Sequence, residues 1–230
     1  MAGPVVVANA PFRWTAELAG LAERADPLLA ADGGANRLVR LGLRPAVVVG
    51  DLDSLEPATR RFLGEERLLL RPEQDRTDLE KVLHHAVDEL GLDRLTVLGA
   101  VGGRVDHTQA NLGLLARRAA GEALVFRTAD ELLVGVRGEA ELGAVVGETW
   151  SFWTYDPVVR VTVTGVRWPV ERAALDAGGR PSISNQAVAT RVGVVAEGGA
   201  VVVMRSAWNS DVTMLRMSAL RCAAVRPSLR

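Results

Sequence analysis

The first half of this 230-residue chain alternates short apolar runs with stretches of helical length. The runs are rich in Val, Leu and Ala, and they lie at residues 5–8, 28–31, 46–49, 67–70 and 95–98. Strands that are apolar along their whole length are buried on both faces, as in a parallel sheet covered by helices. We therefore expect an α/β domain with a mostly parallel sheet.

The stretches between these runs have the pattern of helices, which we expect at residues 15–24, 36–41, 78–90 and 106–120. Thr77 and Glu80 form a capping-box pattern, which predicts that the third of these helices begins at Asp78. Gly42 stands where a helix is commonly closed by glycine.

The pattern changes near Arg127, beyond which short strand-like segments alternate with turn signals. These turn signals are Arg137-Gly138, Asp156-Pro157, Gly178-Gly179 and Gly198-Gly199. The segments lie at residues 149–153, 158–164, 187–195 and 200–204. This regular spacing with few helical stretches predicts an antiparallel β-sandwich. We expect an α/β domain at 1–128, the sandwich at 129–208, and a tail at 209–230 of unknown role, in which 213–224 has the pattern of a short helix.

Composition narrows the possible partners. The formal net charge is -1, which argues against a nucleic-acid binder. The single cysteine, Cys222, cannot form an intramolecular disulfide and suits a reducing compartment. The first residues lack the pattern of a signal peptide, and no apolar run approaches the length of about 18 residues of a membrane helix. We expect a cytoplasmic protein that binds neither nucleic acid nor membrane.

Acids and glycines gather where the predicted strands end. Four segments have this position: Asp32-Gly33-Gly34, Gly50-Asp51-Leu52-Asp53-Ser54, Asp75-Arg76-Thr77-Asp78 and Gly102-Gly103-Arg104-Val105-Asp106. Ligands of open α/β sheets bind beyond the carboxyl ends of the strands. These segments are therefore the predicted site.

Asp51 and Asp53 are two residues apart, so both side chains can point to one side of an extended chain and share a hard cation such as Mg²⁺. Alternatively, one of them caps a helix and the other is a turn residue. Asp75, Asp78 and Asp106 are expected at the same edge, where clustered acids repel each other unless a cation offsets their charge. This clustering favours a metal site.

Phosphate groups also fit this edge. Lys81 lies on the first turn of a predicted helix, whose free N–H groups suit phosphate oxygens, although an ordinary exposed lysine is the alternative. Gly102 and Gly103 allow close backbone approach, and Arg104 can donate two parallel hydrogen bonds to a phosphate. Asp106 has the alternative role of a helix N-cap. The chain contains neither a P-loop nor the motifs of protein kinases.

Together these blocks resemble, in order and spacing, the signature segments of thiamine pyrophosphokinases. The matching segments are Ala31-Asp32-Gly33-Gly34-Ala35-Asn36, Gly50-Asp51-Leu52-Asp53-Ser54, Asp75-Arg76-Thr77-Asp78 with Lys81, and Gly102-Gly103-Arg104-Val105-Asp106-His107. In the second half, residues 164–169 and 182–185 are similar to the thiamine-binding segments of that family. The resemblance implies a Rossmann-like nucleotide-binding domain followed by a β-sandwich. It also implies a homodimer with the thiamine site shared between subunits.

The resemblance further implies roles for individual residues. The implied magnesium ligands are Asp51, Asp53 and Asp78, and the catalytic set adds Lys81, Arg104 and Asp106. Positions assigned to the nucleotide are Asp32, Gly33, Gly34, Asn36, Asp75, Thr77, Gly102 and Gly103. Thiamine is assigned to Trp168, Ser182, Ser184 and Asn185. An indole attracts the cationic thiazolium of thiamine by about 0.5–2 kcal/mol, but without the resemblance we would interpret Trp168 as part of the sandwich core.

The expected reaction is transfer of pyrophosphate from ATP to the hydroxyl of thiamine, giving thiamine diphosphate and AMP. The expected cofactor is Mg²⁺, with ATP as co-substrate. Pyrophosphoryl transfer to another small alcohol, such as a hydroxymethyl pterin, is the nearest alternative. A metal-dependent phosphatase or glycosyltransferase and a non-catalytic nucleotide sensor are the others.

Overall fold

The computed structural model describes residues 3–206. The described residues form two compact units: the first comprises residues 3–114 and 122–132, and the second comprises residues 115–121 and 133–206. The division after Leu132 lies close to the boundary expected at residue 129. Helix α5 (Val105–Arg118) contributes residues to both units. The tail at 209–230, with the helix expected there, falls outside the described residues.

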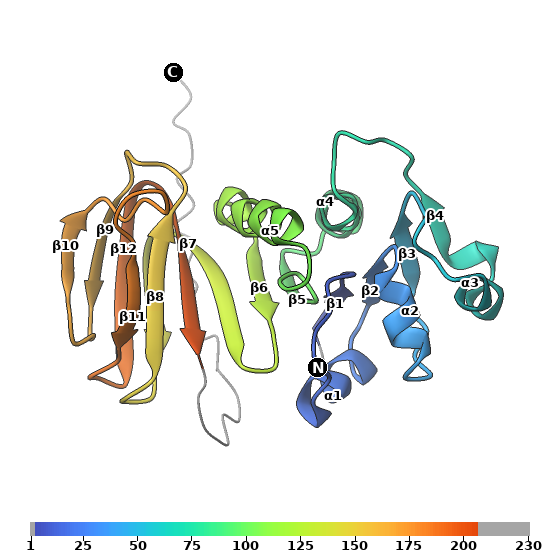
Figure 1. The fold of residues 1–230 in the computed structure, drawn as a ribbon, viewed down its shortest axis with the longest axis horizontal. Helices are drawn as coiled ribbons and strands as arrows, with labels where there is room; N and C mark the ends of the chain where they lie inside the picture. The colour runs from blue at the N-terminus through green and yellow to red at the C-terminus, as the bar shows by residue number, and fades with distance from the viewer. Residues whose placement is uncertain (1–2, 207–230) are drawn as a thin grey trace. The chain divides into compact units, whose positions relative to one another are not determined.

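A parallel six-stranded sheet forms the centre of the first unit (Figure 1). Its strands follow the order β6-β5-β1-β2-β3-β4. Their bounds are β1 Val5–Val7, β2 Leu28–Ala31, β3 Val47–Gly50, β4 Leu68–Leu70, β5 Arg94–Leu98 and β6 Ala123–Arg127. The predicted parallel sheet is confirmed. The sequence did not predict β6, because its apolar run follows the last helix after only a short turn.

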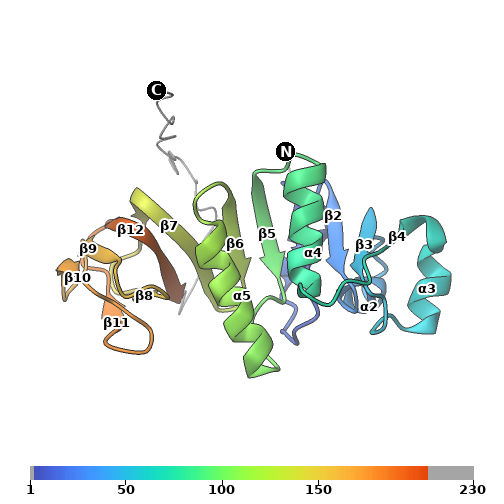
Figure 2. The same cartoon turned by 90° about the horizontal axis from the view of Figure 1, so that it is seen from above.

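Helices cover both faces of this sheet, with α4 on one face and α1 and α2 on the other (Figures 1 and 2). The bounds are α1 Ala16–Glu23, α2 Gly34–Val39, α3 Pro57–Leu63 and α4 Asp78–His84. The predicted capping box is confirmed, because Thr77 Oγ1 accepts from the Glu80 N–H and Glu80 Oε2 accepts from the Thr77 N–H. A π-helical segment at His85–Glu89 follows α4, where a single helix to residue 90 was expected. Helix α3 was not predicted.

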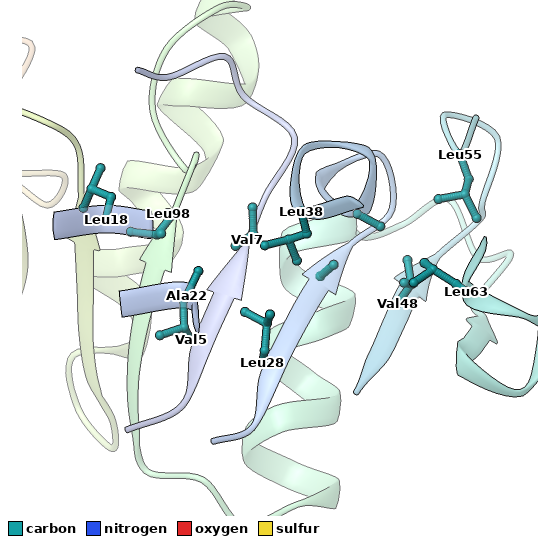
Figure 3. Close-up of a cluster of buried hydrophobic side chains, with 12 residues drawn as sticks. Val5, Val7, Leu18, Ala22, Leu28, Leu38, Val48, Leu55, Leu63 and Leu98 are labelled. Atoms are coloured by element: carbon teal, nitrogen blue, oxygen red, sulfur yellow. The ribbon is translucent and has the colours of Figure 1, made fainter. Parts of the chain in front are cut away.

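The core of the first unit lies between the sheet and helices α1, α2 and α3 (Figure 3). In this cluster Val7 lies beside Leu38 of α2 and Val48 beside Leu63 of α3, and both valines are fully buried (Figure 3). Burying one such side chain contributes about 1.5–3 kcal/mol. This packing fixes the strands, and therefore fixes the positions of the residues that follow their carboxyl ends.

The second unit is built from antiparallel strands. They are β7 Glu131–Gly143, β8 Thr149–Thr154, β9 Arg160–Thr164, β10 Val170–Ala173, β11 Ser182–Gln186 and β12 Arg191–Ser206. Strand β12 pairs with β9 and then with β8, while β10 pairs with β9 and β11 with β8. The predicted antiparallel architecture of the second half is confirmed.

Two turn predictions in this unit are wrong. Arg137-Gly138, expected as a turn, lies inside β7. Gly198-Gly199 was expected to separate two strands, but β12 runs through both glycines. Gly198 has a φ of +83°, and the strand changes its partner from β9 to β8 around these residues. A Cβ on Gly199 would lie 2.5 Å from Val159 Cγ2. The glycines therefore allow a close-packed bend within one strand instead of a reversal.

Candidate active site

Three carboxylates meet at the carboxyl edge of the parallel sheet. Asp32 follows β2, Asp51 follows β3, and Asp78 is the first residue of α4. One oxygen from each lies within 4.8 Å of the others. The sheet brings them together because β2 and β3 are parallel neighbours, and Leu29 and Ala31 pair with Val47 and Val49. Hard oxygen ligands in this arrangement suit a divalent cation.

Asp32 is the buried member of this group, with 1% of its surface exposed. Its Oδ2 accepts a hydrogen bond from the Ser54 N–H at 3.2 Å. Its Oδ1 is buried and has no hydrogen-bond partner among residues 3–206. Burial, and then the charge of Asp78, raise the pKa of Asp32 from 3.8 to about 6. An unpartnered buried oxygen beside two other acids is suited to contact a positive group.

Asp51 has a different environment. Gln74 Nε2 donates to its Oδ2 at 3.2 Å, and the Asp53 N–H donates to its Oδ1 at 3.3 Å. These hydrogen bonds, led by that of Gln74, lower the pKa of Asp51. Leu52 has a φ of +65°, a conformation that non-glycine residues rarely adopt, so the loop is held in a strained turn beside Asp51. Asp51 is therefore ionised and fixed in place.

Gly50 permits the close approach of these acids. A Cβ at this position would lie 2.8 Å from Asp32 Cβ and 3.1 Å from Asp78 Oδ1. Any side chain here would push Asp32 and Asp78 apart. The glycine at the end of β3 is thus required by the geometry of the acid group.

Lys81 supplies the positive charge next to the acids. Its Nζ lies 3.1 Å from Asp78 Oδ1 and 3.9 Å from Asp51 Oδ2, and its side chain is only 2% exposed. The alternative of an ordinary exposed helix lysine is therefore wrong. A buried ammonium between two carboxylates offsets part of their repulsion.

Three other residues predicted for this site, Asp53, Asp75 and Asn36, lie outside the group of three close carboxylates. Asp53 Oδ1 accepts from Ser54 Oγ at 2.9 Å, and Asp53 is not part of the group of three close carboxylates. Asp75 is exposed on the loop before α4. Asn36 holds the loop after β3, because its Nδ2 donates to Ser54 O at 2.9 Å and its Oδ1 accepts from the Glu56 N–H at 3.0 Å. A direct contact of these residues with metal or nucleotide stays a prediction.

The glycine loop after β5 lies next to the loop that follows β1. Gly102 and Gly103 have φ values of +110° and +67°, and a Cβ on either would lie within 2.8 Å of an atom of Pro11. Arg104 donates to both carboxylate oxygens of Asp106, and this holds the pKa of Asp106 at about 2. Helix α5 begins at Val105, so Asp106 lies within its first turn and the N-cap alternative is wrong.

In the second unit, the predicted thiamine residues form one cluster around Trp168. The indole is 57% exposed, so the alternative that Trp168 is core is wrong; Trp150 is the buried one. The guanidinium carbon of Arg167 lies 5.2 Å from the centroid of the Trp168 ring. Asn185 is 1% exposed, and its side chain contacts the backbone of Trp168 and Ser182 Oγ.

Ser184, next to Asn185, has a φ of +57°, and its N–H donates to the buried Ser151 Oγ at 3.1 Å. Sequence reasoning missed Ser151, and it missed Gln74 as the partner of Asp51. No motif marks either residue. Asp32 was assigned to the nucleotide instead of the acid group, although its position at the end of a strand next to β3 was a usable signal.

Comparisons with known proteins point to one family. Residues 18–126 match the family model described as the thiamin pyrophosphokinase catalytic domain. Thiamine pyrophosphokinase 1 of Oryza sativa subsp. japonica is 28% identical over 207 residues, covering 76% of this chain and 74% of that protein. The Bacillus subtilis thiamine pyrophosphokinase is 24% identical over 208 residues, covering 87% and 97%. These comparisons all indicate the thiamine pyrophosphokinase family.

The match to a catalytic-domain model and the names of the relatives indicate an enzyme of the transferase class. The solved thiamin pyrophosphokinase of Geobacillus thermodenitrificans superposes with a TM-score of 0.75 at 24% identity, covering 93% of this chain and all of that one. This likeness shows a common fold over both units of the chain. No helix among residues 3–206 is long and apolar enough to cross a membrane.

Proposed function

We propose that the chain transfers the pyrophosphoryl group of ATP to the hydroxyl of thiamine, giving thiamine diphosphate and AMP. The observation that carries this proposal is the convergence of Asp32, Asp51 and Asp78 with the buried Lys81 at one edge of the parallel sheet. That edge is where open α/β sheets bind ligands. The relatives are named thiamine pyrophosphokinases, and this supports thiamine as the acceptor.

Mg²⁺ fits the acid group. Asp32 Oδ1 lacks a partner among the described residues, and all three groups offer the hard oxygens that Mg²⁺ takes. Asp32, Asp51 and Asp78 would hold the ion, and Asp53 stays a predicted fourth ligand. When bound, the ion would supply positive charge for the phosphate oxygens of ATP.

The residues around the acids would orient the triphosphate. Lys81 would place its ammonium next to phosphate oxygens, and Arg104 would donate to them from the glycine loop. The thiamine oxygen forms a bond to the β-phosphorus of ATP, the bond from that phosphorus to the α-phosphate oxygen breaks, and AMP leaves. Asp106, with a pKa of about 2, is a weak acceptor for the hydroxyl proton, so this proton would pass to Asp78 or to water.

Trp168 would stack on thiamine with its exposed indole, and Ser182 and Ser184 stay predicted contacts of thiamine. The proposal includes the homodimer with a shared thiamine site that the sequence resemblance implies, and a cytoplasmic location.

The test is incubation of the purified chain with [γ-³²P]ATP, Mg²⁺ and thiamine. We expect AMP and labelled thiamine diphosphate in equal amounts, without ADP. A D51N variant should lose this activity, whereas D93N, which changes an exposed acid in the loop before β5, should keep it. Release of phosphate without AMP would refute pyrophosphoryl transfer and favour a phosphatase.

The acceptor is tested separately. With a hydroxymethyl pterin in place of thiamine, we expect no AMP above the rate without acceptor. AMP formation that depends on the pterin and not on thiamine would keep the transfer chemistry but overturn thiamine as the substrate.

A further inference from the structure

The backbone of Trp168 is held by the buried side-chain amide of Asn185. The backbone of residues 165–167 pairs with that of 186–188: Arg167 N–H donates to Gln186 O at 2.8 Å, and Val188 N–H donates to Gly165 O at 2.9 Å. This pairing stops at Arg167, and Pro169 has no N–H to continue it. Trp168 therefore lies just beyond the end of a backbone ladder.

The Asn185 side chain takes the place of the missing strand. Its Oδ1 accepts from the Trp168 N–H at 3.1 Å, and its Nδ2 donates to Trp168 O at 2.7 Å. One amide thus satisfies both backbone groups of Trp168. No other partner of the Trp168 N–H is seen within residues 3–206.

The other two hydrogen-bonding positions of the Asn185 amide are also occupied. Oδ1 accepts a second hydrogen bond from the Gln186 N–H at 2.9 Å, and Nδ2 donates to Ser182 Oγ at 3.4 Å. An amide side chain offers two lone pairs and two N–H donors, so all four positions are occupied. With 1% of its surface exposed, Asn185 has neither a free hydrogen-bonding position nor access to a ligand.

We propose that Asn185 is a positioning residue that acts on thiamine only through Trp168. This inference rests on the proposed function and changes the role that the sequence implied for Asn185, which was direct hydrogen bonding to thiamine. The amide fixes the backbone of Trp168 so that the exposed indole is presented in one orientation. A stacking residue that is held before binding loses less conformational entropy when the ligand arrives.

The kinetic test is a double-mutant cycle with N185A and W168A. We expect N185A to raise the KM for thiamine about tenfold, comparable to the loss of indole stacking, with kcat within about twofold of wild type. In the W168A background, N185A should raise the KM no further, because the residue it positions is already absent. Q186A is the matched control: it alters the neighbouring side chain, leaves the Gln186 N–H in place and should not change KM.

An equal rise in KM in both backgrounds would overturn the proposal and indicate a direct contact between Asn185 and thiamine. If N185A does not fold, the cycle is repeated with the isosteric N185D. Any direct effect of the new carboxylate on cationic thiamine appears in both backgrounds and cancels, so the coupling between the two positions is still measured.

A second measurement does not depend on activity. In protein labelled with ¹⁵N-tryptophan, the backbone amide of Trp168 is assigned by its absence in W168F. We expect its hydrogen exchange to become about tenfold faster in N185A and to stay unchanged in Q186A. Unchanged exchange in N185A would refute the link between the two residues. If the wild-type chain made no thiamine diphosphate, the proposed function would fail, and this measurement would still decide whether Asn185 holds Trp168.

Discussion

The buried Asp32 should make the protein less stable as the pH rises, and replacing it by asparagine should remove that loss. Its pKa lies at about 6 in the folded chain against an ordinary 3.8. Between these values the folded state binds more protons than the unfolded state, so the free energy of unfolding falls as the pH rises through this range. At about 1.4 kcal/mol per pKa unit, the loss approaches about 3 kcal/mol above pH 6 and is absent below pH 3.8.

D32N keeps an oxygen that can accept from the Ser54 N–H, but it carries no charge. We expect D32N to be as stable as wild type near pH 3.8 and more stable by about 3 kcal/mol at pH 7, measured by urea denaturation in EDTA. D93N serves as the control for loss of an exposed acid. The stabilised variant should also lose activity, since it lacks one of the proposed magnesium ligands.

An equal stability difference between D32N and wild type at pH 4 and pH 7 would refute this reasoning. Such a result would mean that the pKa of Asp32 is the same in the folded and unfolded chains, and that its burial and unpartnered oxygen carry no cost.

Three further predictions concern the same unit. Mg²⁺ should stabilise the wild-type chain by about 2.7 kcal/mol at a hundredfold excess over its Kd, read as a rise in Tm, and D51N should show little of this rise. K81M should lower kcat by about 100-fold, because the buried ammonium next to Asp78 is lost; a rate near wild type would remove Lys81 from the site. G34A should destabilise the fold by about 1–3 kcal/mol or more in urea denaturation, because its Cβ would lie 2.2 Å from Val7 O; an unchanged urea midpoint would contradict the tight packing of α2 on β1.

The location of the candidate site was predictable from the sequence because it depends on periodic features. Apolar runs mark the parallel strands, and the residues after neighbouring parallel strands must lie at the same edge. Asp51 and Asp78 could be placed together for this reason. The capping box of Thr77 and Glu80 fixed the start of α4 and therefore the position of Asp78 at its first turn.

Other features depend on packing that no local pattern records. The sequence did not indicate that Gly198-Gly199 would lie inside β12, because a glycine pair is also typical of a turn. The contact of Gln74 with Asp51 joins residues from two loops. The same holds for Asn185, whose contacts with Trp168 cross 17 positions of the chain. Such side-chain contacts follow from the fold and cannot be derived before it.

Asp32 and Asp106 have the largest pKa changes, and they show that a position at the carboxyl edge of the sheet does not determine how an acid ionises. Asp106 lies in solvent beside Arg104, which holds its pKa at about 2, whereas burial and the charge of Asp78 raise the pKa of Asp32 to about 6. Asp106 is therefore ionised at every working pH and is already neutralised by an arginine. Asp32 is ionised only at a cost, which a cation between the three acids would offset. Asp32 is the acid of this group that is least stable as a carboxylate. Its ionised form would therefore gain the most stabilisation from a bound Mg²⁺.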